Sequence, residues 1–246
     1  MTPVVTEAVS KSQSVPASES VVSVRTTDHA VLATLDDGRV NALALPHVRQ
    51  LRDAVVVAVE AALPLVVAGR DGVLSAGFEL TVVRDPRECD FLELLEQTEA
   101  LCVELLTAPV PVVVACTGHA VAAGVLPLLC ADHRVGRFGD YAIGFTEVRL
   151  GMVLPDFALT LARSRLDPRC LPAATVLAEA GTPERAVEVG FLDTLAADSV
   201  AAALEVARDL AALVGPAFTT TKRLAHEALI EELQGQSLLA PDRRQR

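Results

Sequence analysis

A pattern of strand, small-residue loop and helix occurs twice in this chain, and it limits the fold more than any other feature. The first copy is a short apolar run at residues 65–68 followed by a glycine-bearing turn at 69–77. The second is an apolar run at residues 110–116 followed by a loop of small residues at 118–124. Helical spacing comes after each loop. Such alternation is typical of an α/β fold whose strands deliver loops to one edge, where a ligand binds.

The rest of the chain supplies a hairpin before this pattern and helices after it. Residues 21–25 and 30–35 read as two strands around a turn, and residues 46–62 have helical spacing. A run of valines inside 46–62 would suit a strand almost as well, but the length of the segment favours a helix. The remaining expected elements are short strands at 134–135, 141–144 and 191–195, and helices at 155–165, 171–180, 183–189, 199–214 and 218–233.

We expect four parts along the chain. Residues 1–20 and 236–246 lack a usable period and are predicted to be flexible tails. Residues 21–196 are predicted to form the core, and residues 197–235 a helical module. The last two helices are amphipathic enough to pack against this core or against a neighbouring subunit.

Composition excludes several classes of protein. The formal net charge is −11 and the chain has only two lysines, which makes an extended nucleic-acid surface implausible. Five cysteines stand in apolar runs without metal-ligand spacing, as expected for buried thiols in a reducing compartment. The apolar runs are too short or too interrupted to span a bilayer, and no basic segment with a following apolar stretch opens the chain. We expect a cytoplasmic protein that binds no metal, no other cofactor, no membrane and no nucleic acid.

Three motifs carry the functional signal. Residues 72–80 read Gly-Val-Leu-Ser-Ala-Gly-Phe-Glu-Leu, residues 118–124 read Gly-His-Ala-Val-Ala-Ala-Gly, and residues 141–151 end in Glu-Val-Arg-Leu-Gly. Asn-Ala-Leu precedes them at 41–43. In this order and spacing, from about residue 21 to 233, the set resembles the crotonase (enoyl-CoA hydratase/isomerase) superfamily. It is similar above all to its 3,2-enoyl-CoA isomerase-like members.

The resemblance implies a ββα spiral core with a C-terminal helical module used for trimerisation. It implies an acyl-CoA substrate, with CoA as the carrier of the thioester, and a homotrimer or a dimer of trimers. By position, the backbone amides of Phe78 and Ala123 would hold the thioester carbonyl, although Ala123 stands where the family has glycine. Amides at a tight turn and at a helix N-terminus are suitable donors for such an oxyanion.

The number of carboxylates at the site separates the reactions of this superfamily. Hydration in its best-known members uses two glutamates that hold one water, and the matching positions here are Leu126 and Glu147. A leucine neither hydrogen-bonds a water nor accepts its proton, so hydration is disfavoured. Moving a double bond from the 3 to the 2 position needs one proton shuttle. Glu147, among apolar neighbours, is the candidate catalytic residue; the alternative is a surface glutamate paired with Arg149.

Other residues complete the predicted site. Asp156 could enter the acyl pocket as a second polar group, but an N-cap for the following helix is the preferred interpretation. His119, beside the second motif, is interpreted as a packed or partly exposed histidine. The predicted acyl-pocket residues are Leu126, Phe145, Leu154 and Asp156, and the predicted CoA-binding residues are Arg39, Ala42, Ala76 and Lys222.

The leading hypothesis is a 3,2-enoyl-CoA isomerase that acts through an oxyanion-stabilised enolate with Glu147 as the single proton shuttle. The enzymatic alternative is an enoyl-CoA hydratase or another pathway-specific crotonase, for example of secondary metabolism, that uses the same enolate. An alternative of another class is a non-catalytic acyl-thioester-binding or assembly protein, which Leu126 and Ala123 would also fit.

Overall fold

The strands form two sheets, and from β3 onward successive strands alternate between them. The computed structural model describes residues 20–80 and 88–235, so the predicted tails at 1–19 and 236–246 lie outside the described residues. The large sheet has the order β1-β2-β3-β5-β7-β9, and the small sheet has the order β4-β6-β8. Among the strand pairs of the described residues, β1–β2 is antiparallel and the others are parallel. The large sheet consists of Val22–Thr26, Val31–Leu35, Leu65–Gly69, Val112–Cys116, His133–Arg137 and Thr194–Ala196, and the small sheet of Gly72–Ser75, Gly118–Val121 and Ile143–Gly144.

Each middle strand of the large sheet is followed directly by a strand of the small sheet. The chain runs from β3 to β4 and then to α3 (Glu88–Thr107), and from β5 to β6 and then to α4 (Leu126–Cys130). This repetition confirms the predicted ββα spiral. β4 and β6 themselves were predicted as a turn and a loop, which is wrong. They pair so closely that a Cβ on Gly118 would lie 2.0 Å from the carbonyl carbon of Gly72, so glycine here serves strand pairing.

The predicted N-terminal hairpin and the helix after it are confirmed. β1 and β2 pair antiparallel, and α1 spans Leu45–Ala61. Its buried face presents Val48, Leu51 and Val55 at helical spacing, and the valine run that suggested a strand is divided between this face and solvent. The helix ends at Ala61, and the capping residue Ala62 has a left-handed φ of 51°.

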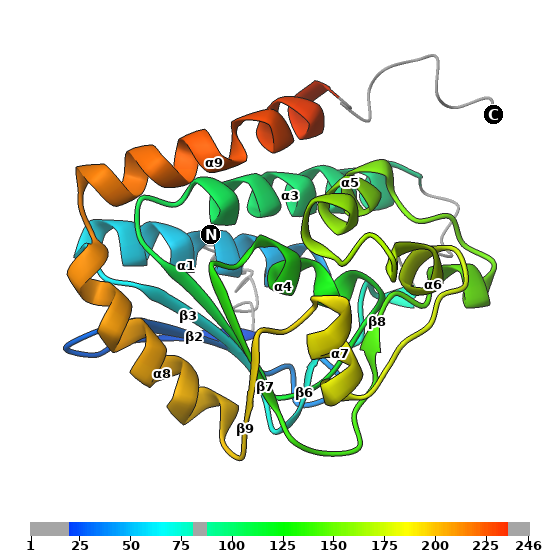
Figure 1. Cartoon of the computed structure of the whole chain (residues 1–246), viewed down its shortest axis with the longest axis horizontal. Coiled ribbons are helices and arrows are strands. Elements are labelled where there is room, and N and C mark those ends of the chain that lie inside the picture. The colour runs from blue at the N-terminus through cyan, green and yellow to red at the C-terminus, as the bar shows by residue number, and fades with distance from the viewer. Residues whose placement is uncertain (1–19, 81–87, 236–246) are drawn as a thin grey trace, which may run out of the picture.

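Helices cover both faces of the large sheet (Figure 1). α1 and α3 lie on one face, and α8 (Ser199–Leu210) lies on the other, where Ala203 and Ala207 pack against Val66 and Val113. α9 (Pro216–Gly235) runs alongside α3. The remaining helices are α5 (Asp156–Arg165), α6 (Leu171–Thr175) and α7 (Pro183–Val189), so the helix predicted for 171–180 ends early.

Cysteine burial follows the prediction. Cys102, Cys116 and Cys130 are free and buried, and Cys170 is free and half-buried. Burial raises the pKa of the Cys116 thiol to about 12. The side chain of Cys89 lies outside the described residues.

Lys222, predicted to bind CoA, lies inside the fold instead. Its ammonium is 2.6 Å from Oδ2 of Asp132, and only 4% of its side chain is exposed. The same carboxylate oxygen accepts a hydrogen bond from the backbone amide of Val112, at the first residue of β5. Burial lowers the pKa of Lys222. The lysine therefore fixes α9 to the amino-terminal end of the large sheet.

We predict that Lys222→Met lowers the free energy of unfolding by about 2 kcal/mol. Breaking a buried pair typically costs 3–5 kcal/mol, and the value is reduced here because Asp132 is 20% exposed and keeps the Val112 amide. Arg223→Met on the exposed side of α9 is the control and should change stability by less than about 0.5 kcal/mol. Urea denaturation of both variants gives the comparison; equal stabilities would show that the ion pair does not anchor α9.

Candidate active site

A cavity of about 380 Å³ lies where the loops after β4, β6 and β8 meet. Its wall is apolar except for two adjacent side chains, Thr146 and Glu147. The described residues that line it are Ala76, Phe78, Leu80, Phe91, Val121, Ala122, Thr146, Glu147, Leu150, Met152, Val153 and Pro155. Glu147 is the one ionisable side chain in this described lining, and all three sequence motifs contribute to it.

Glu147 is the first residue of a 3-10 turn, Glu147–Leu150, and stands three residues after the end of β8. The residue is 6% exposed, and its Oε2 accepts a hydrogen bond of 2.9 Å from the Thr146 amide. Burial raises the pKa of this carboxyl, against the lowering effect of the nearby backbone amides. The alternative surface pair with Arg149 is not formed, because Nε of Arg149 donates to the carbonyl of Ala178 at 2.6 Å.

Phe78 forms an isolated parallel bridge with Leu43, and its own amide points away from Leu43. Leu43 donates to the carbonyl of Gly77 at 2.7 Å and accepts from the amide of Glu79 at 3.0 Å. In a parallel bridge the residue between these two partners turns its own N–H to the opposite side. The amide of Phe78 is therefore available to a ligand on that side.

The second predicted donor, Ala123, lies against the same turn. Gly77 has a φ of 87°, and a Cβ added to it would be 3.1 Å from the Ala123 nitrogen and 2.7 Å from the Cβ of Ala122. The turn of the first motif and the loop of the second are thus in contact through Gly77. This contact brings the two predicted oxyanion donors to one place beside the cavity.

Ala122 adopts a left-handed φ of 51°, a conformation that sequence reading missed at this position. An alanine in this region costs roughly 1–2 kcal/mol relative to right-handed backbone. It directly precedes Ala123 and opens the 3-10 turn Ala122–Val125 that leads into α4. Strained backbone next to a cavity is typical of functional sites.

Asn41 connects the first motif to the loop before α1. The side chain is fully buried, and its Nδ2 donates to the carbonyls of Leu35 (3.0 Å) and Leu74 (3.1 Å). Its own carbonyl accepts a 2.7 Å bond from the Ser75 hydroxyl, which in turn accepts from the Gly77 amide at 3.2 Å. Asn41 and Ser75 therefore fix the position of the turn that carries Phe78.

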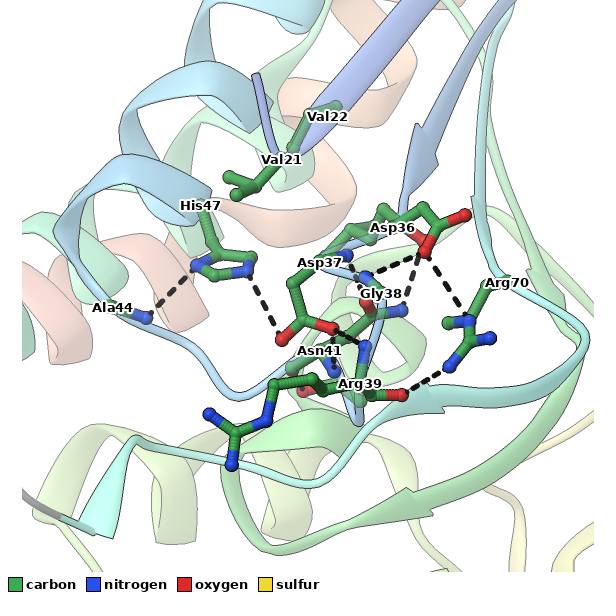
Figure 2. Close-up of polar contacts among 12 residues, drawn as sticks. Val21, Val22, Asp36, Asp37, Gly38, Arg39, Asn41, Ala44, His47 and Arg70 are labelled. Carbon is green, nitrogen blue, oxygen red and sulfur yellow. Dashed lines mark hydrogen bonds and ion pairs between the residues drawn. The ribbon is translucent and has the colours of Figure 1, made fainter. Parts of the chain in front are cut away.

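The loop around Arg39 is organised by two aspartates (Figure 2). Oδ1 of Asp37 accepts hydrogen bonds from the amides of Arg39 (2.7 Å) and Asn41 (3.0 Å), and the Arg39 carbonyl accepts from Arg70. Burial would raise the pKa of Asp37, but these amide bonds lower it overall. His47 lies beside this loop, with Nε2 3.9 Å from Oδ2 of Asp37, and burial lowers its pKa. The Arg39 side chain is exposed and extends away from these contacts.

Three of the predicted site residues line the cavity: Ala76, Phe78 and Glu147. Arg39 and Ala42 stand on the loop before α1, where their CoA-binding roles stay predictions. His119 is exposed, with its Nδ1 accepting a hydrogen bond from the Ala142 amide at 3.0 Å and its ring edge against Tyr141.

None of the four predicted acyl-pocket residues is in the described lining of the cavity. Leu126 is 2% exposed and borders a separate small apolar cavity between α1, α3 and α4. Phe145 is fully buried with its ring edge against Phe191, and Leu154 packs on the main core. Asp156 is the first residue of α5, whose N-cap is Pro155, so the N-cap prediction for Asp156 is wrong. The alternation of buried and cavity-facing side chains along the third motif was not visible in its sequence.

Sequence reading missed most of the apolar wall, including Leu80, Phe91, Met152 and Val153, as well as Thr146. Thr146 and Met152 stand within or next to the third motif, which was the available signal. Within residues 20–80 and 88–235, no three histidine, cysteine, aspartate or glutamate side chains gather as metal ligands would. None of the helices in these ranges is long and apolar enough to cross a membrane.

Strands that alternate between two sheets, with paired backbone turns beside an apolar cavity, define a crotonase-type protein. The family model described as enoyl-CoA hydratase/isomerase matches residues 26–240, and the chain belongs to this family.

Individual relatives agree with this membership. The chain is 34% identical to a Mycobacterium tuberculosis protein, with a TM-score of 0.83 over 88% of this chain and 96% of the other. That protein is described as an enoyl-CoA isomerase in one structure and as a probable enoyl-CoA hydratase in another. It is 32% identical to an enoyl-CoA hydratase of Mycobacterium ulcerans, with a TM-score of 0.84 over 88% and 96%. It is also 29% identical to the peroxisomal enoyl-CoA delta isomerase 2 of Arabidopsis thaliana over 125 residues, which are 49% of this chain. The match spans about half, 52%, of that curated relative.

Proposed function

We propose that this protein is a 3,2-enoyl-CoA isomerase with Glu147 as its proton shuttle. The observation that carries the proposal is the single ionisable side chain in the described lining of an otherwise apolar cavity. A site for double-bond migration needs one group that acts first as base and then as acid. Relatives named as isomerases agree with this choice, while others of similar identity are named as hydratases, so the choice rests on the cavity.

In the proposed mechanism the thioester carbonyl accepts hydrogen bonds from the amides of Phe78 and Ala123. Glu147 removes a proton from C2 of the 3-enoyl group, and the two amides stabilise the negative charge that develops on the carbonyl oxygen. The electron pair of the C–H bond forms the C2–C3 double bond as the enolate collapses, and the C3–C4 pair takes up the proton at C4. Glu147 ends as it began, ionised.

One oxygen of Glu147 is suited to carry the proton. Oε2 accepts a hydrogen bond from the Thr146 amide, which fixes the orientation of the carboxyl group. The proton then resides on the other oxygen, Oε1. A raised pKa serves such a shuttle, because the carboxyl must accept a proton from carbon and return it in the same turnover.

Hydration is the less well supported alternative. It needs a second carboxylate to hold the water, and the family position for it is Leu126, a buried core residue here. An inert binding protein is also less well supported, because a cavity that buries a carboxyl with a raised pKa is typical of catalytic sites.

An activity assay tests the proposed reaction: purified protein should convert a 3-enoyl-CoA to the conjugated 2-enoyl-CoA, which is measured by ultraviolet absorbance. Water addition to a 2-enoyl-CoA at a higher kcat/KM would favour the hydratase instead.

The pH dependence of the reaction should report the burial of Glu147. The base form is the carboxylate, so kcat/KM should fall as the pH drops through the pKa of Glu147 in the free enzyme. Because burial raises this pKa, the midpoint of the acid limb should lie above the ordinary value of 4.5. The profile is measured with a 3-enoyl-CoA while circular dichroism confirms that the protein stays folded. An acid limb centred at or below 4.5 would contradict the proposed role of burial.

The predicted trimer or dimer of trimers and the predicted cytoplasmic location stay predictions.

A further inference from the structure

Thr146 is the second polar side chain in the cavity wall, next to Glu147. Its backbone amide is committed to the Glu147 carboxyl, but within the described part of the chain its hydroxyl donates to no protein atom. The residue is half-buried and lines the cavity, so its hydroxyl lies within reach of a ligand bound there.

Buried threonines elsewhere in this protein have acceptors of their own. Thr98 donates to the Leu94 carbonyl at 2.7 Å, and Thr175 donates to the Leu171 carbonyl at 2.7 Å. Two further buried threonines form bonds of 3.1 and 3.0 Å, Thr117 with the Val73 carbonyl and Thr160 with Glu232. Thr146 differs from these four buried threonines in two ways: it is half-buried, and within the described residues its hydroxyl has no protein acceptor.

The free hydroxyl limits which acyl chains the cavity accepts well. A pure hydrocarbon chain would displace water from the Thr146 hydroxyl and offer no partner in return, and a polar group buried without a partner is unfavourable. The thioester oxygen cannot be that partner in the proposed mechanism, because the two backbone amides hold it. Thr146 is adjacent to Glu147, the residue proposed to act at C2 and C4, so the partner expected beside its hydroxyl is another atom of the acyl group.

We propose that the acyl substrate carries a second oxygen, a carbonyl or a hydroxyl, close to the carbons that exchange protons with Glu147, and that Thr146 is the residue that recognises it. This inference rests on the proposed function, since it assumes that acyl-CoA fills this cavity. It narrows the substrate class from plain fatty enoyl thioesters to oxygenated ones, because a site built to hydrogen-bond a substrate oxygen discriminates against the analogue that lacks it.

Binding of unreactive saturated thioesters tests this recognition without proton transfer. Octanoyl-CoA, 4-oxo-octanoyl-CoA and 5-oxo-octanoyl-CoA are titrated calorimetrically into the wild-type protein, Thr146→Val and Thr146→Ser. Valine has the shape of threonine without the hydroxyl, and serine keeps the hydroxyl. The wild type and Thr146→Ser should bind one oxo probe about tenfold more tightly than octanoyl-CoA, and this preference should disappear in Thr146→Val.

Two results would overturn the inference. One is equal binding of all three probes by the wild type, as a retained water on Thr146 would produce. The other is an oxo preference that survives in Thr146→Val. The two proposals fail separately: a protein that shows the Thr146-dependent preference but does not isomerise 3-enoyl-CoA would contradict the proposed reaction alone.

Discussion

Replacement of Glu147 by glutamine should reduce kcat for conversion of a 3-enoyl-CoA to its 2-enoyl isomer by roughly 10³-fold or more. A positioned acid–base group contributes about 10²–10⁴-fold to such a step, and the described lining of the cavity offers no second ionisable side chain to replace this one. KM should change little, because the amides and the apolar wall remain. Stopped assays with excess enzyme measure the residual rate.

The Glu147→Gln protein should be at least as stable as the wild type at neutral pH. A folded-state pKa above the unfolded one means that the ionised carboxyl is disfavoured in the fold, so removing its charge costs nothing above that pKa. The amide oxygen of glutamine can still accept from Thr146. Glu79→Gln, next to Phe78, is the control for a general loss of negative charge and should remain active. An active Glu147→Gln enzyme would eliminate the proposed shuttle.

Gly77→Ala should reduce kcat by about 10²–10³-fold, the usual effect of losing one oxyanion donor. The new Cβ would lie 2.7 Å from the Cβ of Ala122 and 3.0 Å from the carbonyl oxygen of Val121. Neither neighbour can accommodate it without separating the turn of Phe78 from the loop of Ala123. The same crowding, added to the φ of 87°, should lower the free energy of unfolding by roughly 2–4 kcal/mol.

Gly72→Ala separates these two effects. Gly72 has a similar φ of 81°, but a Cβ there meets no atom within 4 Å. This variant should lose about 1 kcal/mol of stability and keep its kcat. Assays at a temperature where circular dichroism shows both variants folded give the comparison. Equal kcat values for the two variants would show that contact through Gly77 does not position the donors.

The sequence predicted those parts of the fold in which local pattern and tertiary environment agree. α1 has its apolar residues at helical spacing, and the apolar runs at 65–68 and 110–116 became neighbouring strands β3 and β5. β4 and β6 were missed because strands of four residues that contain glycine and other small residues look like turns. Only their pairing with each other shows why glycine is required.

The sequence predicted those site residues whose position is set by a backbone motif. It did not predict which neighbouring side chains point into the cavity and which point into the core. Phe78 and Glu147 stand at the cavity because the turn and the 3-10 segment place them there. Phe145, two residues before Glu147, points into the core, and no periodicity in so short a segment indicates this. Lys222 was misassigned because its partner, Asp132, lies 90 residues away in the sequence.

The most direct test of the account follows a labelled proton from C2 to C4. A 3-enoyl-CoA with deuterium at both C2 positions is isomerised in ordinary water, and early product is analysed by mass spectrometry and NMR. Glu147 is 6% exposed before substrate fills the cavity, so a proton on it should exchange slowly with solvent. A single shuttle therefore predicts 2-enoyl-CoA in which part of the removed deuterium is found at C4. Product with only solvent hydrogen at C4 from the first turnovers would contradict a mechanism in which Glu147 alone carries the proton.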